Sequence, residues 1–205
     1  MTQETAAIYQ KKFSYHHGQL REALIEAALD TLQDQGIDGL SLRALAQATD
    51  VTPAALYSHF RGKEDLLAAV AEAGFQKLAL QMAEYATGCK DAQTRIERLV
   101  TSYVYFALYN RPLFRLMFSG PAHDMKEYPT LAMTAGKSYA LISAVLSKRE
   151  NANDDTPLLT VAIWSMCHGL TSLLIDDKMT VEQFGAKSVD DFVKRVIGLF
   201  SSHLS

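Results

Sequence analysis

Apolar residues recur along this chain every three to four positions, the spacing of one helix face, and no stretch alternates apolar and polar residues as a half-buried strand does. The first such segment predicts a helix from about His17 to Gln35, which Gly36 is placed to end. Four acidic residues at intervals of four mark its water-facing side: Glu22, Glu26, Asp30 and Asp34. The whole pattern predicts an all-α fold of about nine helices.

Two short helices are expected next. Ser41 is a good N-cap for a helix from Leu42 to Thr49, and Thr52 is one for a helix from Pro53 to Phe60, because hydroxyl oxygens accept from the free N–H groups at a helix start. Asp50 lies in the break between them, and Asp tolerates the left-handed backbone that such a turn requires. Two short helices joined by a tight turn form a helix-turn-helix.

The rest of the chain predicts longer helices and one polar loop, which spans Glu150 to Thr156. These helices are expected at about Lys63 to Tyr85, Gln93 to Tyr109, Pro112 to Ser119, Thr130 to Lys148, Leu158 to Asp176 and Ser188 to Ser202. We therefore predict a three-helix N-terminal helix-turn-helix domain over residues 1–62 and a C-terminal helical bundle over residues 63–205. The first ~14 residues, with Lys11 and Lys12, form either an arm over DNA or a disordered tail.

Composition limits how a nucleic-acid interface can be built. The chain has 205 residues, 48% of them hydrophobic, with a formal net charge of -3 and a pI of about 6.1. Because there is no general excess of basic residues, any DNA-binding surface must be local. Cys89 and Cys167 fit no metal spacing and are interpreted as reduced thiols. Together with a polar N-terminus that lacks the pattern of a secretory signal, they predict a cytoplasmic protein.

The helix predicted over Pro53 to Phe60 has a face suited to DNA. Leu56 and Phe60 are its only large apolar anchors, so they fix the inward side. At 100° per residue, Ala54 and Ser58 then point furthest outward, with Tyr57 and His59 on the flanks. Small central residues let the backbone sit deep in a major groove about 12 Å wide, while the flanking groups reach phosphates.

Taken one at a time, the residues around this helix have a plainer interpretation. Thr52 and Pro53 form a cap, Tyr57 is a packing residue, and Arg43 and Lys63 are solvated charges. Their arrangement in order favours the DNA-binding interpretation, because cationic groups, hydroxyls and free N–H groups near helix N-termini converge on anions.

The N-terminal part of the chain resembles the DNA-binding domain of the tetracycline-repressor (TetR) family of bacterial transcription regulators. The likeness covers residues 15–24, 36–46 and 51–67, at the spacing that the family has. The runs Leu40-Ser-Leu-Arg-Ala-Leu-Ala46 and Val51-Thr-Pro-Ala-Ala-Leu-Tyr-Ser-His-Phe60 carry most of the likeness. One departure is Asp50, where the family commonly has Gly. The resemblance implies that Ala54 and Ala55 lie near base edges. It also implies phosphate contacts from Ser41, Arg43, Thr52, Tyr57, His59 and Lys63.

The segment from Leu158 to Asp176 is apolar on nearly every side. Because polar residues interrupt it and no basic cluster flanks it, we predict a buried core helix and not a membrane span. A second subunit is the natural cover, with two helices from each protomer forming a four-helix interface. A dimer also spaces two helix-turn-helix units about 34 Å apart, as a palindromic operator requires. The expected interface residues are Leu158, Trp164, Leu170, Leu173, Phe192, Val196 and Phe200.

The middle helices are rich in aromatic residues and methionine, which suits an adaptable apolar pocket, although plain core packing explains the same composition. The candidate pocket residues are Tyr103, Phe106, Met117, Phe118, Met133, Tyr139, Trp164 and His168. His168 and a tyrosine hydroxyl are the expected polar groups of a pocket for a mainly apolar small molecule.

The run Ile163-Trp-Ser-Met-Cys-His-Gly-Leu170 also resembles the Trp-x-x-x-His-Gly signature of one TetR C-terminal subfamily, with residues 110–118 as a second match. The resemblance to the TetR family as a whole implies a repressor that a ligand releases, since this is the family's usual mode of regulation. Two alternatives remain: a regulator whose C-terminal domain contacts protein partners without a ligand, and a helical enzyme using His168, Cys167 or His123. No catalytic or metal-ligand spacing supports an enzyme, and we expect no cofactor and no metal, a His16-His17 site included.

Overall fold

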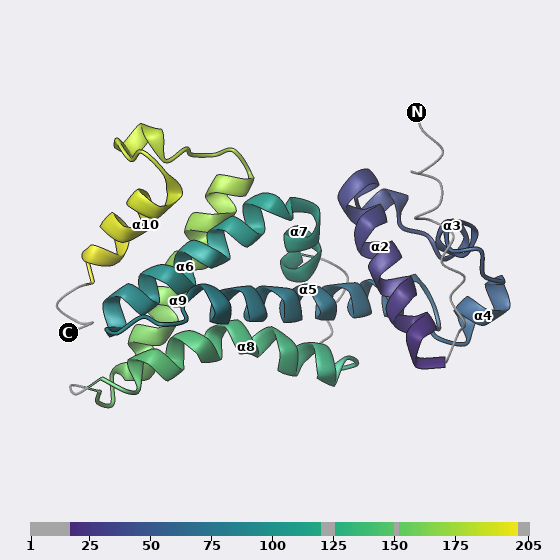
Figure 1. Cartoon of the computed structure of the whole chain (residues 1–205), viewed down its shortest axis with the longest axis horizontal. Helices are drawn as coiled ribbons and strands as arrows, with labels where there is room; N and C mark the ends of the chain where they lie inside the picture. Colours follow the sequence, from purple (N-terminus) through teal and green to yellow (C-terminus); the bar gives the residue numbers. More distant parts are fainter. Residues whose placement is uncertain (1–16, 120–125, 150–151, 201–205) are drawn as a thin grey trace.

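The computed structural model of the chain describes residues 17–119, 126–149 and 152–200. Over these residues it contains nine α-helices, one short 3-10 helix and no strand. Three helices, α2 (His17–Gly39), α3 (Leu42–Ala48) and α4 (Pro53–Tyr57), form an N-terminal helix-turn-helix unit at one end of the molecule (Figure 1). The long helix α5 (Lys63–Tyr85) leads from this unit into a bundle of the remaining helices, as the all-α prediction requires.

The N-terminal unit forms because local signals stop and start its helices. Gly36 has a φ of 70° and a ψ of -173°, so it interrupts α2 where the sequence predicted an end. Asp50 has a φ of 54°, which confirms the expected left-handed turn between α3 and α4. Helix α4 ends at Tyr57, three residues earlier than expected, because the His59 N–H turns to the Leu56 carbonyl three residues back and tightens the chain.

Helix α5 is the central element, buried along most of its length and in contact with α2, α6, α7 and α8. Its contact with α7 (Arg111–Ser119) is close at Gly74. A Cβ added there would lie 2.7 Å from the Met117 Sδ atom and 2.9 Å from Leu113 Cδ1, so a larger residue would require these two side chains to move.

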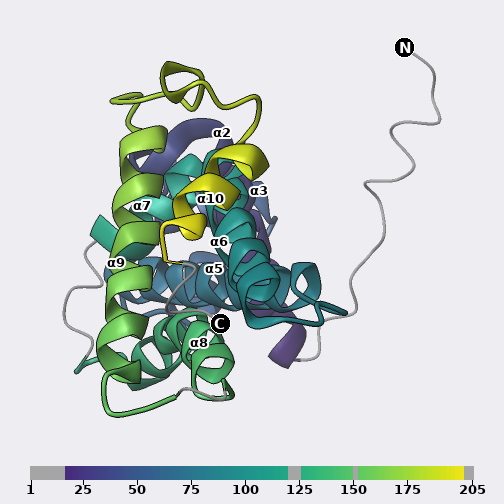
Figure 2. The ribbon, with the colours of Figure 1, turned by 90° about the vertical axis from the view of Figure 1, so that its left-hand side faces the viewer.

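The bundle is completed by α6 (Ala92–Tyr109), α8 (Pro129–Leu146), α9 (Thr156–Ile175), the 3-10 helix η1 (Glu182–Phe184) and α10 (Val189–Gly198). The predicted ends of α5 to α9 agree within two residues, and η1 was not predicted. Both α9 and α10 pack on α6 and lie on the outside of the bundle (Figure 2). The last helix was predicted to run to Ser202, but α10 ends at Gly198 and residues 199 and 200 form a turn, so the predicted end is wrong. The predicted N-terminal arm lies outside the described residues.

Among the described helices, α9 is the one that is long and apolar enough to cross a membrane by length and composition alone. Such a helix also occurs in the cores of soluble proteins, so it is weak evidence for a span. Here one side of α9, with Ile163 and Cys167 fully buried, packs on α6 and α8. The prediction of a core helix therefore fits this packing better than a membrane span does.

Candidate functional site

The exposed face of α4 is the first feature of the site. Leu56 and Phe60 are buried, as their helical spacing predicted, and they fix the orientation of the helix. Ala54 and Ser58 are exposed, Tyr57 is 58% exposed, and His59 is half-buried on the flank. The structure thus presents a small-residue surface with a phenol beside it, in the arrangement expected from the sequence.

Hydroxyl groups fix the starts of both helices of the turn. The Ser41 Oγ accepts from the Ala44 N–H at 3.1 Å, and the Thr52 Oγ1 accepts from the Ala55 N–H at 3.2 Å, so both predicted N-caps are confirmed. Each hydroxyl keeps its proton for another acceptor. The Ser58 hydroxyl differs, because it donates its proton to the Ala55 carbonyl at 2.7 Å. It can therefore act toward another molecule only as a hydrogen-bond acceptor.

Cationic side chains surround this surface. Arg43 is exposed at the start of α3, and the exposed Lys63 at the start of α5 donates from Nζ to the Ile37 carbonyl at 3.4 Å, a long hydrogen bond. The Arg21 guanidinium lies 5.5 Å from the centre of the Phe60 ring, a cation–π contact that adds a charge near α4. Sequence reasoning did not select Arg21, since nothing in helical spacing pairs α2 with Phe60.

A polar network joins the turn before α5 to the residue before α8. The Arg61 guanidinium donates to both carboxylate oxygens of Asp65 at 2.7 Å, and the Tyr128 hydroxyl donates to Asp65 Oδ1 at 3.1 Å. Mainly through the Arg61 hydrogen bonds, the pKa of Asp65 is lowered from 3.8 to about 2. These three residues also line a cavity of about 390 Å³. The i,i+4 spacing of Arg61 and Asp65 is visible in the sequence, whereas Tyr128 has no sequence signal.

An aromatic cluster surrounds His168 inside the bundle. The Tyr103 hydroxyl lies 3.0 Å from His168 Nδ1, the Phe118 ring is 4.5 Å from the imidazole, and Trp164 stacks on it at 5.9 Å. We name Tyr103, Phe114, Phe118, Trp164 and His168 the His168 cluster. Burial lowers the pKa of His168 and raises that of Tyr103, so the pair is neutral at physiological pH.

The other predicted pocket residues are distributed differently. Tyr139 meets the edge of Trp164 at 6.3 Å, and Phe106 and Met117 are buried in the core. Met133 is 69% exposed, so its placement in an internal pocket is wrong: the buried positions around it on α8 are Leu131, Thr134 and Ser138. No member of the His168 cluster lines the cavity beside Arg61 or either of two cavities along α8.

The face of α9 turned away from the bundle is apolar and exposed. Leu158 is 69% exposed, and Val161 and Leu173 are about half exposed, with Ala162, Ser165 and Gly169 between them. We name these six residues the outer face of α9. Trp164, Leu170, Val196 and Phe200 are half-buried. Phe192 is buried within the protomer, with its ring 5.5 Å from that of Phe184, so it has little surface for a partner and its inclusion in an interface is wrong.

The groups considered for catalysis are not arranged for it in the described part of the chain. Cys167 is fully buried, and desolvation raises the pKa of its thiol, which disfavours a nucleophilic thiolate. Within residues 17–119, 126–149 and 152–200, no three His, Cys, Asp or Glu side chains are grouped to hold a metal ion. His16 and His123 lie outside the described residues.

Comparison with protein families matches two parts of the chain. Residues 24–70 match the family described as bacterial regulatory proteins, tetR family, and residues 96–200 match the tetracyclin repressor-like C-terminal domain. The first match covers most of α2 and all of α3 and α4, and the second covers most of the bundle. Neither match tests the finer resemblance to the Trp-x-x-x-His-Gly subfamily, which stays a prediction.

Individual relatives agree with the family matches. An uncharacterised HTH-type transcriptional regulator of Bacillus subtilis, YobS, is 26% identical over 167 residues, which cover 81% of this chain and 84% of that protein. The class C tetracycline repressor of Escherichia coli is 51% identical over 53 residues, or 26% of this chain and 24% of that protein. Among solved structures, a protein of unknown function from Rhodococcus superposes with a TM-score of 0.79 and 29% identity, covering 94% of this chain and 99% of that one.

Proposed function

The chain belongs to the TetR family of DNA-binding transcriptional regulators, and we propose that it acts as a homodimeric repressor that a small, mainly apolar ligand releases from a palindromic operator. The observation that carries the proposal is the exposed, small-residue face of α4 with its ring of hydroxyl and cationic groups. We propose residues 1–62 as the DNA-binding domain and residues 63–205 as the sensing and dimerisation domain, in a cytoplasmic, non-enzymatic protein.

The polar side chains that we propose as DNA contacts have a geometry that supports this role. Ser41 and Thr52 accept from helix N–H groups and so keep a hydroxyl proton to donate to phosphate oxygens. Arg43, Tyr57 and Lys63 are exposed donors for further phosphates, with His59 beside them. The residues that approach base edges are Pro53, Ala54, Ala55 and Ser58.

The outer face of α9 supports a dimer interface. Its exposed leucines and valine form an apolar surface, and the small residues Ala162, Ser165 and Gly169 allow a second α9 to approach closely. With Val196 of α10 and Phe200, two residues after the end of that helix, two protomers would form a four-helix interface, since α9 and α10 both pack on α6. A two-fold axis there presents two α4 helices to successive turns of a palindromic site.

A chain of ring contacts supports coupling between ligand and DNA. The Phe118 ring lies 4.5 Å from His168 and 5.1 Å from Phe75, which belongs to α5. Because interiors are close-packed, a ligand inserted beside His168 must displace Phe118 and with it Phe75. Helix α5 begins at Lys63 in the DNA-binding surface, so its movement changes the separation of the two α4 helices.

The alternative function, a regulator without a small-molecule ligand, is favoured by the close ring packing around His168. Selection of bound fragments from a random DNA pool tests the DNA-binding half of the proposal. It should enrich a palindrome with half-sites about one helical turn apart. Compounds are then screened for release of that DNA. Enrichment without any releasing compound would favour the alternative, and no enrichment at all would contradict the proposed function.

A further inference from the structure

Two surface cavities lie end to end along α8 and have no role in the proposed function. One has a volume of about 510 Å³ between α5 and α8, and the other has about 340 Å³ between the ends of α5, α6 and α8. Both are lined by Leu141, and we name the two cavities together the α8 groove. Each cavity has a volume in the range of a small-molecule site.

The floor of the α8 groove is apolar. Ala79, Leu99 and Val145 are buried beneath it, and the Leu80 side chain, 64% exposed, stands at one end. Alanines on successive turns of α8, Ala140 and Ala144, keep it open, because a larger side chain at either position would fill it. An exposed apolar channel of this kind favours an occupant with a hydrocarbon chain.

The rim of the groove is cationic. Lys137, Arg95 and Lys148 line it, and no acidic residue does. Lys137 and Lys148 lie three helical turns apart on α8 and the turn after it, about 16 Å. Neither lysine forms an ion pair with the described part of the chain. The Arg95 guanidinium is held by one hydrogen bond, from Nη2 to the Cys89 carbonyl at 2.9 Å, so it keeps other N–H groups to donate.

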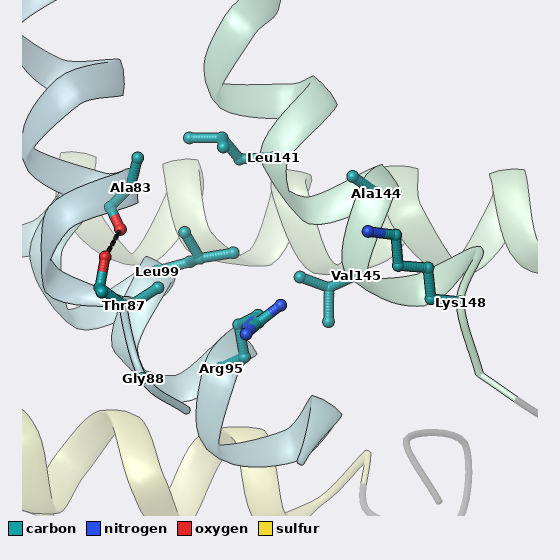
Figure 3. Close-up of a pocket in the computed structure, with 10 residues that line it drawn as sticks. Ala83, Thr87, Gly88, Arg95, Leu99, Leu141, Ala144, Val145 and Lys148 are labelled. Carbon is teal, nitrogen blue, oxygen red and sulfur yellow. Dashed lines mark hydrogen bonds between the residues drawn. The ribbon is translucent and has the colours of Figure 1, made fainter. Parts of the chain in front are cut away.

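Two cations line the same end of the groove. Arg95 comes from α6 and Lys148 from the turn that follows α8, and in Figure 3 they flank Val145 with their nitrogen atoms turned to the cavity. A carboxylate is a group that a guanidinium and an ammonium can bind together through charge-assisted hydrogen bonds. The apolar path from there runs along Leu141 toward Leu80.

A second copy of the chain is a poorer occupant. Pairing this face with itself around a two-fold axis would bring its lysines and arginine against one another without a carboxylate from the groove to compensate. An anion with a long apolar chain matches both the floor and the rim.

We propose that the α8 groove binds a single-chain fatty acid, with its carboxylate between Arg95 and Lys148 and its hydrocarbon chain along Leu141. This site is separate from the ligand of the proposed function, because no residue of the His168 cluster lines the groove. The inference does not depend on DNA binding, so either proposal can fail without the other.

The test measures displacement of a dansyl-labelled undecanoic acid from the full-length protein by laurate, and by dodecanol as the matched chain without a charge. Laurate should bind about tenfold more tightly than dodecanol, because the charge-assisted contacts at Arg95 and Lys148 are absent from the alcohol. Lys148→Gln should weaken laurate about threefold and leave dodecanol unchanged. Lys178→Gln, an exposed lysine at the end of α9, is the control and should change neither.

Groove-filling variants locate the binding. Ala144→Trp and Ala140→Trp should each abolish displacement, while Ala44→Trp, at an exposed alanine of α3, should not. Two filling variants are used so that one remains informative if the other fails to fold, as thermal melting will show. Equal affinity for laurate and dodecanol, no binding of the probe, or binding that survives both folded tryptophan variants would each overturn the proposal.

Discussion

The Tyr128 hydroxyl donates a hydrogen bond to Asp65 at 3.1 Å and so joins the residue before α8 to the first turn of α5. The same carboxylate receives two hydrogen bonds from the Arg61 side chain and one from its backbone N–H. Asp65 therefore connects the turn that precedes α5, next to the proposed DNA contact Lys63, to the helix bundle. Side chains in such networks are coupled, and removing one changes the contribution of the others.

Asp65→Asn is expected to lower the free energy of unfolding by about 1 kcal/mol at neutral pH, because the bidentate Arg61 contact is lost at a partly exposed site. The pKa of Asp65 is lower in the folded protein than in the unfolded chain, so its stabilisation is present above about 3.8 and is lost as the pH falls toward about 2. Urea unfolding of both proteins over this range measures the difference. A constant difference across the range would contradict the assignment.

Tyr128→Phe is expected to cost about 0.5–1 kcal/mol, the net value of one hydrogen bond. In a double-mutant cycle with Asp65→Asn, the double variant should lose less stability than the sum of the two single variants, because both remove the same contact. Tyr85→Phe serves as a control, since its hydroxyl donates to Asp190, far from the network. Strict additivity with Asp65→Asn would mean that the Tyr128 bond contributes nothing in solution.

His168 is expected to make stability depend on pH. Burial lowers its pKa below 6.5 in the folded protein, so the unfolded chain binds a proton that the folded protein does not. The resulting stabilisation is present above pH 6.5 and declines as the pH falls below it. Replacing the imidazole by an amide in His168→Gln should therefore flatten the stability curve below pH 6.5. The free energy of unfolding of both proteins is measured by urea unfolding as a function of pH. The same pH dependence below pH 6.5 in both would mean that a group other than His168 is responsible.

Leu173→Glu, at the outer face of α9, should convert the proposed dimer into monomers without unfolding the protomer, since Leu173 is about half exposed. Burying an unpaired carboxylate at an apolar interface costs several kcal/mol, enough to dissociate a dimer at micromolar concentration. Sedimentation velocity measures the mass. Leu80→Glu, at an exposed leucine of α5, is the matched control and should leave it unchanged. A Leu173→Glu protein that sediments as the wild type does would contradict the interface.

The features that the sequence predicted correctly are those that depend on interactions between residues close together in the chain. The inward side of α4 follows from two large apolar residues four apart, Leu56 and Phe60, and the caps at Ser41 and Thr52 follow from hydroxyl chemistry at helix starts. These features need only neighbours along the chain. The boundaries of α5 to α9 agree within two residues for the same reason, whereas α4 and α10 end earlier than predicted.

Contacts between helices that are far apart in the sequence could not be predicted from the spacing of apolar residues. Met133 was assigned to a pocket because it is apolar, yet α8 turns Thr134 and Ser138 inward and leaves Met133 in solvent. Phe192 was assigned to an interface, and the unpredicted helix η1 covers it with Phe184. The Tyr128 bond to Asp65 joins residues 63 positions apart. Each of these three outcomes depends on how one helix is placed against another. Hydrophobic periodicity alone does not specify that placement.

The measurement that tests the central claim most directly is the affinity of Tyr57→Ala and Lys63→Ala proteins for the selected operator. Both variants should fold as the wild type does and bind about tenfold more weakly, and Lys63→Ala should also reduce the salt dependence by about one phosphate contact. Tyr109→Ala, at a 73% exposed tyrosine at the end of α6, should bind as the wild type does. Unchanged affinity in both Tyr57→Ala and Lys63→Ala would contradict the DNA-binding surface proposed for α4 and the start of α5.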